Sequence, residues 1–139
     1  MVKANKLLKE FKLDAYAKKY PKELSGGMRQ RIALIRTHLF SKDVSLLDEP
    51  FSALDAITKD EMHDWYMNMR RKYKTSTIFI THDVDEAILL SDRIYILGDG
   101  DIKTEIKIEA SVRDNSFKLT KEFLEYKKSV IGCLESGNT

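Results

Sequence analysis

The chain has 139 residues, 42% hydrophobic and 33% charged, a composition typical of one globular unit with a modest core. Its 24 basic and 22 acidic residues leave a net charge of +2, too small to indicate a nucleic acid or an anionic membrane as partner. A single cysteine, Cys133, excludes an internal disulfide, and no apolar run could span a bilayer, so we expect a cytoplasmic protein.

Helices are expected in the first forty residues. Lysines alternate with apolar residues at helical spacing in the opening stretch, and the pattern should stop near Pro21, because the residue before a proline disfavours the α region. Apolar residues recur at helical intervals after Ser25-Gly26-Gly27, up to Leu39, and predict an amphipathic helix that starts behind the glycines.

Two buried strands are predicted in the middle of the chain. The apolar run at residues 44–47 ends in Asp48-Glu49-Pro50, and residues 77–80 form a second run. We expect the two strands to pair in a parallel sheet, with any chemistry at the carboxyl end of the first.

Helices are predicted to follow both strands. Capping-box spacing at residues 58–61 starts a helix that should run to about Tyr73, and residues 83–86 open another through Leu90. Alternating residues on either side of Gly98-Asp99-Gly100 predict a β-hairpin with one wetter face. The tail over residues 120–134 reads as helical.

Ser25, Gly26 and Gly27 place a hydroxyl and two glycines at a predicted helix start. Backbone amides at such a position, together with the helix dipole, can bind phosphate oxygens. The alternative is an N-cap followed by a tight turn, which taken alone is the simpler interpretation.

Asp48 and Glu49 follow the first predicted strand. One carboxylate could hold a magnesium ion while the other polarises an attacking water, and the alternative is a solvated strand end. Adjacent strand residues point to opposite sides, so both can face one ligand only if the chain begins to turn at Glu49, which Pro50 favours.

His82 follows the second strand, where an imidazole could contact a terminal phosphate, although a lone histidine is more often structural. Ser52-Ala53-Leu54-Asp55 could be no more than a turn with a helix cap.

The order of these segments resembles the ABC ATPases. Residues 24–30 resemble the signature motif of that family, residues 44–49 its Walker B strand, residues 52–55 its D-loop, and His82 its switch histidine. Met28 departs from the glutamine most often found in the signature, as in some importer subfamilies. The resemblance covers residues 7–108.

In that family two ATPase subunits enclose two ATP molecules. The resemblance implies that Ser25, Gly26 and Gly27 act in trans on the γ-phosphate held by the partner subunit.

The remaining roles implied by the resemblance fall on the strand ends. Asp48 would bind Mg²⁺, Glu49 would act as general base, and His82 would contact the γ-phosphate. Asp55 and its loop would link the two sites across the dimer.

The glycine-rich phosphate loop of the family, Walker A, needs a Gly-Lys pair, and the chain contains none. Gln30, the sole glutamine, lies in the signature, so the Q-loop glutamine is missing too. We therefore expect a C-terminal part of such a subunit, with an α/β, partial RecA-like P-loop NTPase core that lacks the Walker A strand and cannot hydrolyse ATP alone.

The expected organisation has three parts. Residues 1–40 would end a helical subdomain, residues 41–110 would form part of the RecA-like core, and residues 111–139 would be a helical tail. Unpaired strand edges and an uncovered apolar face favour self-association, so we expect such a chain to form an oligomer or to rearrange its hairpin.

The parent subunit implied by the resemblance powers uptake of a nitrate-, sulfonate- or taurine-like solute. It would use ATP and Mg²⁺ as a homodimer on membrane permease subunits at the inner face of the cell membrane, with an extracytoplasmic solute-binding protein as indirect partner. The alternatives are a soluble ABC ATPase of DNA repair or translation, and a non-catalytic binding module that keeps the signature.

Overall fold

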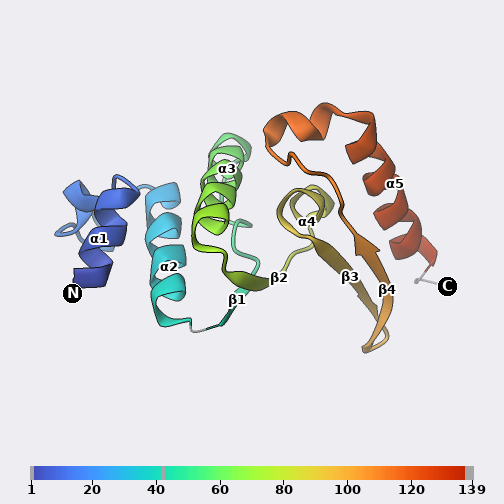
Figure 1. Cartoon of the computed structure of the whole chain (residues 1–139), viewed down its shortest axis with the longest axis horizontal. Coiled ribbons are helices and arrows are strands. Elements are labelled where there is room, and N and C mark those ends of the chain that lie inside the picture. Colours follow the sequence, from blue (N-terminus) through green and yellow to red (C-terminus); the bar gives the residue numbers. More distant parts are fainter. Residues whose placement is uncertain (1, 42, 137–139) are drawn as a thin grey trace. The chain divides into compact units, whose positions relative to one another are not determined.

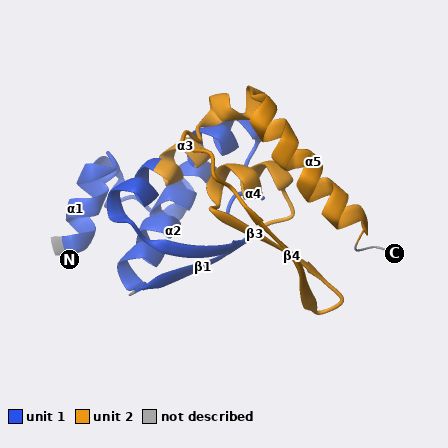
Figure 2. Cartoon of the chain, turned by 45° about the vertical axis from the view of Figure 1, so that its right-hand side comes forward, with its two compact units in different colours: residues 1–62, 68–80 blue, residues 63–67, 81–139 orange. Residues whose placement is uncertain are grey.

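The computed structural model describes residues 2–41 and 43–136 (Figure 1). The chain divides into two compact units (Figure 2). The first unit consists of residues 1–62 and 68–80, and the second of residues 63–67 and 81–139. Residue 1 of the expected first region and residues 137–139 of the expected tail lie outside the described residues. None of the described helices is both long enough and apolar enough to cross a membrane.

The first unit opens with helices α1 (Val2–Glu10) and α2 (Gly26–Phe40). α1 ends well before Pro21, because Lys12 takes a left-handed φ of 57° and the chain continues in short 3₁₀ turns. The expectation that the helical pattern would run close to Pro21 is therefore wrong. The buried apolar side chains in this region are Leu7, Leu13, Leu24, Leu34 and Ile35.

Strands β1 (Val44–Asp48) and β2 (Ser76–Ile80) pair in parallel, which confirms the predicted pairing. Leu46 lies opposite Ile78, so these two side chains share one face of the sheet. That face is open and apolar in this chain, with Leu46 72% and Ile78 61% exposed, so the expectation that both strands are buried is wrong for this face. On the opposite face of β1, Ser45 is buried.

Helix α3 (Ala56–Tyr73) lies between these strands in the sequence. It starts two residues before the predicted Thr58, because the Asp55 side chain accepts a hydrogen bond from the Thr58 amide and acts as N-cap. Its end at Tyr73 is as predicted, with Lys74 in the left-handed conformation that commonly closes a helix. Met62 and Met69 on this helix are buried in the core.

The second unit contains helix α4 (Val84–Leu90) and a hairpin of β3 (Arg93–Gly98) and β4 (Asp101–Lys107). The two strands are antiparallel, as predicted, and the turn uses positive φ at Asp99 and Gly100. Ile94 and Ile96 are buried while Tyr95 and Leu97 are exposed, so one face is indeed wetter.

The C-terminal tail packs on this unit. A 3₁₀ turn at Asn115–Leu119 precedes helix α5 (Lys121–Ser136), which contacts α4 and β3. Phe117 and Phe123 meet edge to face with ring centroids 5.3 Å apart. Arg113 donates hydrogen bonds to the Ser91 carbonyl and the Asp92 carboxylate, which fixes the chain before the turn.

Candidate functional site

Ser25 caps helix α2. Its Oγ accepts a hydrogen bond from the Met28 amide at 3.2 Å, and its backbone is extended, as an N-cap requires. Gly26 and Gly27 are the first residues of the helix. Ser25 is therefore an N-cap, as the alternative interpretation stated, but no separate tight turn follows it. Backbone amides in the first turn of a helix have no carbonyl partner within the helix, so their N–H groups point toward the space in front of the helix start.

The two glycines differ in their surroundings. Gly27 is buried, and a Cβ there would lie 3.0 Å from Thr58 Cγ2 on α3. A Cβ on Gly26 would meet Leu54 Cδ2 at an ordinary 3.7 Å. The missing side chain at Gly27 therefore allows the start of α2 to approach the start of α3.

Gln30 is a link that the sequence did not indicate. Its side-chain amide donates a hydrogen bond to the backbone carbonyl of Pro50, directly after the carboxylates of β1. The sequence singled out Gln30 only as part of the signature, because no local pattern predicts a contact between Gln30 and Pro50.

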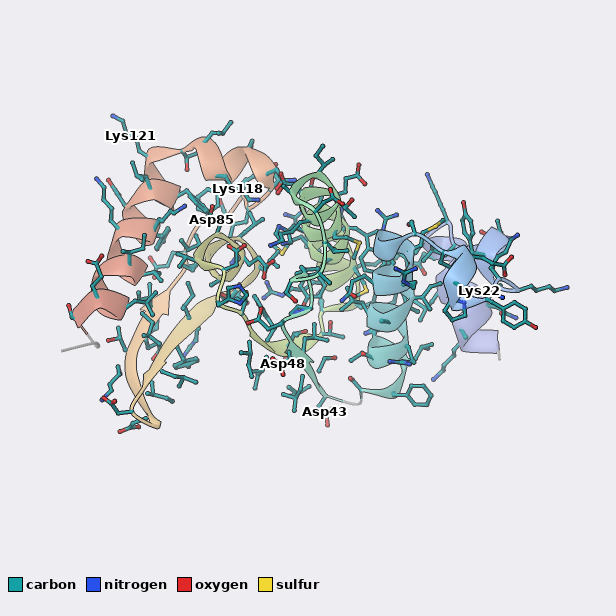
Figure 3. The ribbon with its side chains drawn as sticks, turned by 180° about the vertical axis from the view of Figure 1, so that it is seen from behind. Lys22, Asp43, Asp48, Asp85, Lys118 and Lys121 are labelled. Atoms are coloured by element: carbon teal, nitrogen blue, oxygen red, sulfur yellow. The ribbon has the colours of Figure 1, made fainter. Side chains whose placement is uncertain are left out.

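Asp48 and Glu49 lie where β1 ends, and Figure 3 labels the Asp48 side chain. The Glu49 amide still donates to the Ile80 carbonyl at 2.9 Å, so the parallel pairing continues to this residue. Its φ of 46° then turns the chain, as the sequence argument required. Asp48 is exposed and Glu49 half-buried, so both carboxylates reach the end of the strand.

The loop between β1 and α3 is held by short-range hydrogen bonds. Ser52 donates from its amide and from its Oγ to the Glu49 carbonyl, at 3.3 and 3.1 Å. The Asp55 carboxylate accepts from the Thr58 amide at 3.0 Å and from the Thr58 hydroxyl at 2.6 Å. These bonds lower the pKa of Asp55, and the bond from the Thr58 hydroxyl has the largest effect. Ala53 is exposed and Leu54 half-buried.

His82 belongs to the second unit, where its side chain is exposed between Thr81 and Asp83. Asp83 caps α4 through hydrogen bonds that its Oδ1 accepts from the amides of Asp85 and Glu86. This confirms the predicted start of α4.

A buried pair lies beside that turn. His63 and Glu86 are each 2% exposed, and His63 Nε2 lies 3.3 Å from Glu86 Oε1. Neither residue was singled out from the sequence, because they stand 23 positions apart on separate helices and each one alone fits an ordinary polar helix position.

The structure thus brings most of the sequence-derived candidates into one unit. The start of α2, the carboxylates at the end of β1 and the following loop all belong to the first unit, and the hydrogen bond from Gln30 to Pro50 links α2 to that loop. His82 lies in the other unit. Among the described residues, no group of three or more histidine, cysteine, aspartate or glutamate side chains could hold a metal ion alone.

The sequence relatives point to one family. The family described as ABC transporter matches residues 1–52. An aliphatic sulfonates import ATP-binding protein from Bacillus cereus is 44% identical over 126 residues, which cover 91% of this chain and 50% of that protein. A sulfate/thiosulfate import ATP-binding protein from the same species is 44% identical over 101 residues, covering 73% of this chain and 28% of the relative.

The chain belongs to the ABC transporter ATP-binding proteins. It spans about half the length of the sulfonate import relative it matches. A solved metal-chelate type ABC transporter in an inward-facing conformation superposes with a TM-score of 0.68 at 24% identity, covering 92% of this chain and 48% of that one. The α/β fold with its parallel and antiparallel strand pairs is thus that of part of an ABC ATPase domain.

Proposed function

We propose that this chain carries the signature, Walker B, D-loop and switch-histidine segments of the ATP-hydrolysing subunit of an ABC importer. The observation that supports this most directly is the turn at Glu49. A left-handed residue directly after a parallel strand ends the alternation of side chains and lets Asp48 and Glu49 serve one ligand. The 44% identity to an import ATP-binding protein over most of the chain supports the same assignment.

The donor set fits magnesium held together with a phosphate. Mg²⁺ binds through one or two protein carboxylates and keeps waters and phosphate oxygens as its other ligands. The exposed Asp48 at the end of β1 supplies such a carboxylate, and no closed protein cage is needed. When bound, the ion would neutralise charge on the phosphates.

In ATP hydrolysis the candidate site residues would have separate roles. Glu49 would accept a proton from the attacking water as general base. His82 would donate a hydrogen bond to the γ-phosphate. Ser25, Gly26 and Gly27 would contact the γ-phosphate of ATP held by a partner subunit, through amides of the first turn of α2 and the helix dipole.

The Ser25 hydroxyl can cap and bind at the same time. Its oxygen accepts from the Met28 amide, and its hydrogen stays available for a phosphate oxygen. Asp55 is occupied as a helix cap through both carboxylate oxygens. We therefore propose that Ser52, Ala53, Leu54 and Asp55 link the two sites through the shape of the loop.

A phosphate loop has to come from outside these 139 residues, because the sequence has no Gly-Lys pair. We propose a RecA-like core completed by that element, with residues 1–40 in a helical subdomain, residues 41–110 in the core and residues 111–139 as a tail. Two such subunits would act as a homodimer.

The solute is proposed from the relatives. The names of two of them specify aliphatic sulfonates and sulfate or thiosulfate, and these names support a sulfonate-like solute among the nitrate-, sulfonate- and taurine-like solutes expected from the sequence. The subunit would work at the inner face of the membrane on permease subunits, with an extracytoplasmic solute-binding protein as indirect partner.

The test compares ATP hydrolysis by this chain with hydrolysis by a fusion that places the first half of the Bacillus cereus sulfonate relative before it. We expect turnover only from the fusion. Glu49→Gln should lower its kcat by about 10² or more while ATP binding persists, since a general base contributes that much. A fusion that binds ATP and turns it over equally well after the Glu49→Gln substitution would contradict the assignment of Glu49.

A further inference from the structure

The starting observation is the buried pair of ionisable side chains beside the His82 turn. His63 on α3 and Glu86 on α4 lie in the same unit, both 2% exposed. Burying ionisable side chains carries a desolvation cost that only good geometry and further hydrogen bonds offset. The further bonds of Glu86 lead to the residues on either side of His82.

The hydrogen bonds form a closed ring. Thr81 Oγ1 donates to Glu86 Oε2 at 2.8 Å and accepts from the Asp83 amide at 3.0 Å. The Glu86 amide donates in turn to Asp83 Oδ1 at 3.1 Å. His82 lies between Thr81 and Asp83, so the backbone is fixed on both sides of it.

The charge of Glu86 determines the direction of the bond between Thr81 and Glu86, whereas the two backbone amides of the ring can only donate. Burial alone would raise the pKa of this carboxyl, but hydrogen bonds from His63 and Thr81 hold the pKa below its usual range. An ionised carboxylate only accepts, so the Thr81 hydrogen points to Glu86 and its lone pair receives the Asp83 amide. For the same reason His63 carries a hydrogen on Nε2.

Another acidic side chain of α4 has its own partner. Asp85, the next acidic residue of α4, is paired with Lys127 of α5 at 2.7 Å and so is engaged away from Glu86. His63 is the basic side chain that contacts the Glu86 carboxylate.

We propose that His63 and Glu86 are positioning residues that hold the Thr81–His82–Asp83 turn in one conformation and thereby set the orientation of the His82 imidazole toward phosphate. The consequence for catalysis rests on the role of His82 in the proposed function, whereas the ordering of the turn does not. Both side chains are buried, so each would act through His82.

Amide hydrogen exchange in the 139-residue chain tests the ordering of the turn. Thr81→Val keeps the shape but removes the hydroxyl, and Thr81→Ser keeps the hydroxyl. We expect the Asp83 amide to exchange about tenfold faster in the valine variant and near the wild-type rate in the serine variant. Unchanged exchange in Thr81→Val would overturn the proposal.

A second pair of variants tests His63 itself. Leucine removes the donor to Glu86, while glutamine keeps one in its side-chain amide. His63→Leu should accelerate exchange at Asp83, and His63→Gln should not. Equal effects of the two substitutions would show that volume rather than the hydrogen bond matters, and would count against the proposal.

Hydrolysis by the fusion described above tests the action through His82. We expect His63→Leu to lower kcat about tenfold with little change in KM for ATP, and His63→Gln to restore it. In a His82→Ala background the His63→Leu change should have no further effect. A further loss there would overturn the positioning role. If His82→Ala alone leaves kcat unchanged, the assigned role of His82 fails and the exchange results still decide the ordering of the turn.

Discussion

Glu49 combines a proposed catalytic side chain with an unfavourable backbone. Its φ of 46° lies in the left-handed region, which costs a residue other than glycine about 1 kcal/mol. Its amide remains bonded to Ile80 and its carbonyl to Ser52, so neighbouring hydrogen bonds maintain the turn. Strain of this kind is concentrated at functional sites.

Relieving this strain should separate stability from activity. We expect Glu49→Gly to keep or raise the free energy of unfolding, by up to about 1 kcal/mol, because glycine adopts positive φ freely. Hydrolysis by the fusion should nevertheless be lost. Urea denaturation followed by circular dichroism measures the first effect, and a loss of more than about 1 kcal/mol would show that the Glu49 side chain stabilises the turn.

Gly27 should tolerate a methyl group less well than Gly26. The added Cβ at Gly27 would lie 3.0 Å from Thr58 Cγ2, and two hydrogen bonds to Asp55 hold Thr58 in place. We expect Gly27→Ala to destabilise the chain by about 1–2 kcal/mol through overpacking. Gly26→Ala, with an ordinary 3.7 Å contact, should be neutral or slightly stabilising, since alanine favours the helix.

Thr58→Ser supplies the control for that prediction. Serine keeps the hydroxyl bonded to Asp55 and removes the methyl group that Gly27→Ala would strike. The double variant should therefore recover most of the lost stability in urea unfolding. No recovery would mean that the cost of alanine arises elsewhere.

At the scale of the elements, α1 is tied to the end of α3. The Tyr73 hydroxyl donates a hydrogen bond to the Glu10 carboxylate, and Lys72 forms an ion pair with the same group. The Tyr73 ring also lies 6.1 Å from that of Phe11. Burial, together with the bond to Glu10, raises the pKa of Tyr73 to about 12.

The raised pKa predicts a loss of stability in alkali. An unfolded tyrosine ionises near pH 10, so the stabilisation from Tyr73 is complete below pH 10 and is lost as the pH rises toward about 12. We expect the stability advantage of the wild type over Tyr73→Phe to be constant up to about pH 9 and to shrink above about pH 10. Urea midpoints at a series of pH values measure it, and an advantage that does not change with pH would contradict the bond to Glu10.

The elements that the sequence predicted well are those set by local periodicity. β1, β2 and α4 begin and end close to their predicted positions, because apolar runs and cap residues mark them. The start of α3 was misplaced because two candidate caps, Asp55 and Thr58, compete, and only the geometry shows that Thr58 donates to Asp55.

The candidate site was predictable in part for the same reason. Each motif of the site is a short run of neighbouring residues, which a sequence pattern can reveal. The bond from Gln30 to Pro50 and the pair of His63 with Glu86 instead join residues that are distant along the chain. Such contacts depend on how helices pack, and a single sequence carries no local signal for them.

At the scale of the whole molecule, the open face of the β1–β2 sheet governs behaviour in solution. Val44, Leu46, Ile78 and Ile80 lie on it, each at least 48% exposed. Because an exposed apolar face next to free strand edges favours association, we expect this chain to form oligomers. Sizing with light scattering at working concentration tests this, and a monomeric mass would count against it.

Charges on that face should reverse the association. Leu46→Lys and Ile78→Lys alter side chains that are mostly exposed, so the fold should persist while the mass falls toward that of a monomer. Leu119→Lys is the matched control, because Leu119 is 89% exposed but lies outside the sheet. An equal fall in mass with the Leu119 variant would mean that added charge alone disperses the chain.

The same face has a consequence inside a cell. Chaperones and proteases act on proteins that display apolar surface, and they remove a chain faster when that surface stays uncovered. Whatever covers Leu46 and Ile78 therefore sets the lifetime of the chain as well as its solubility. A partner that covers this face should raise the abundance of the polypeptide, and copies that stay uncovered should be degraded.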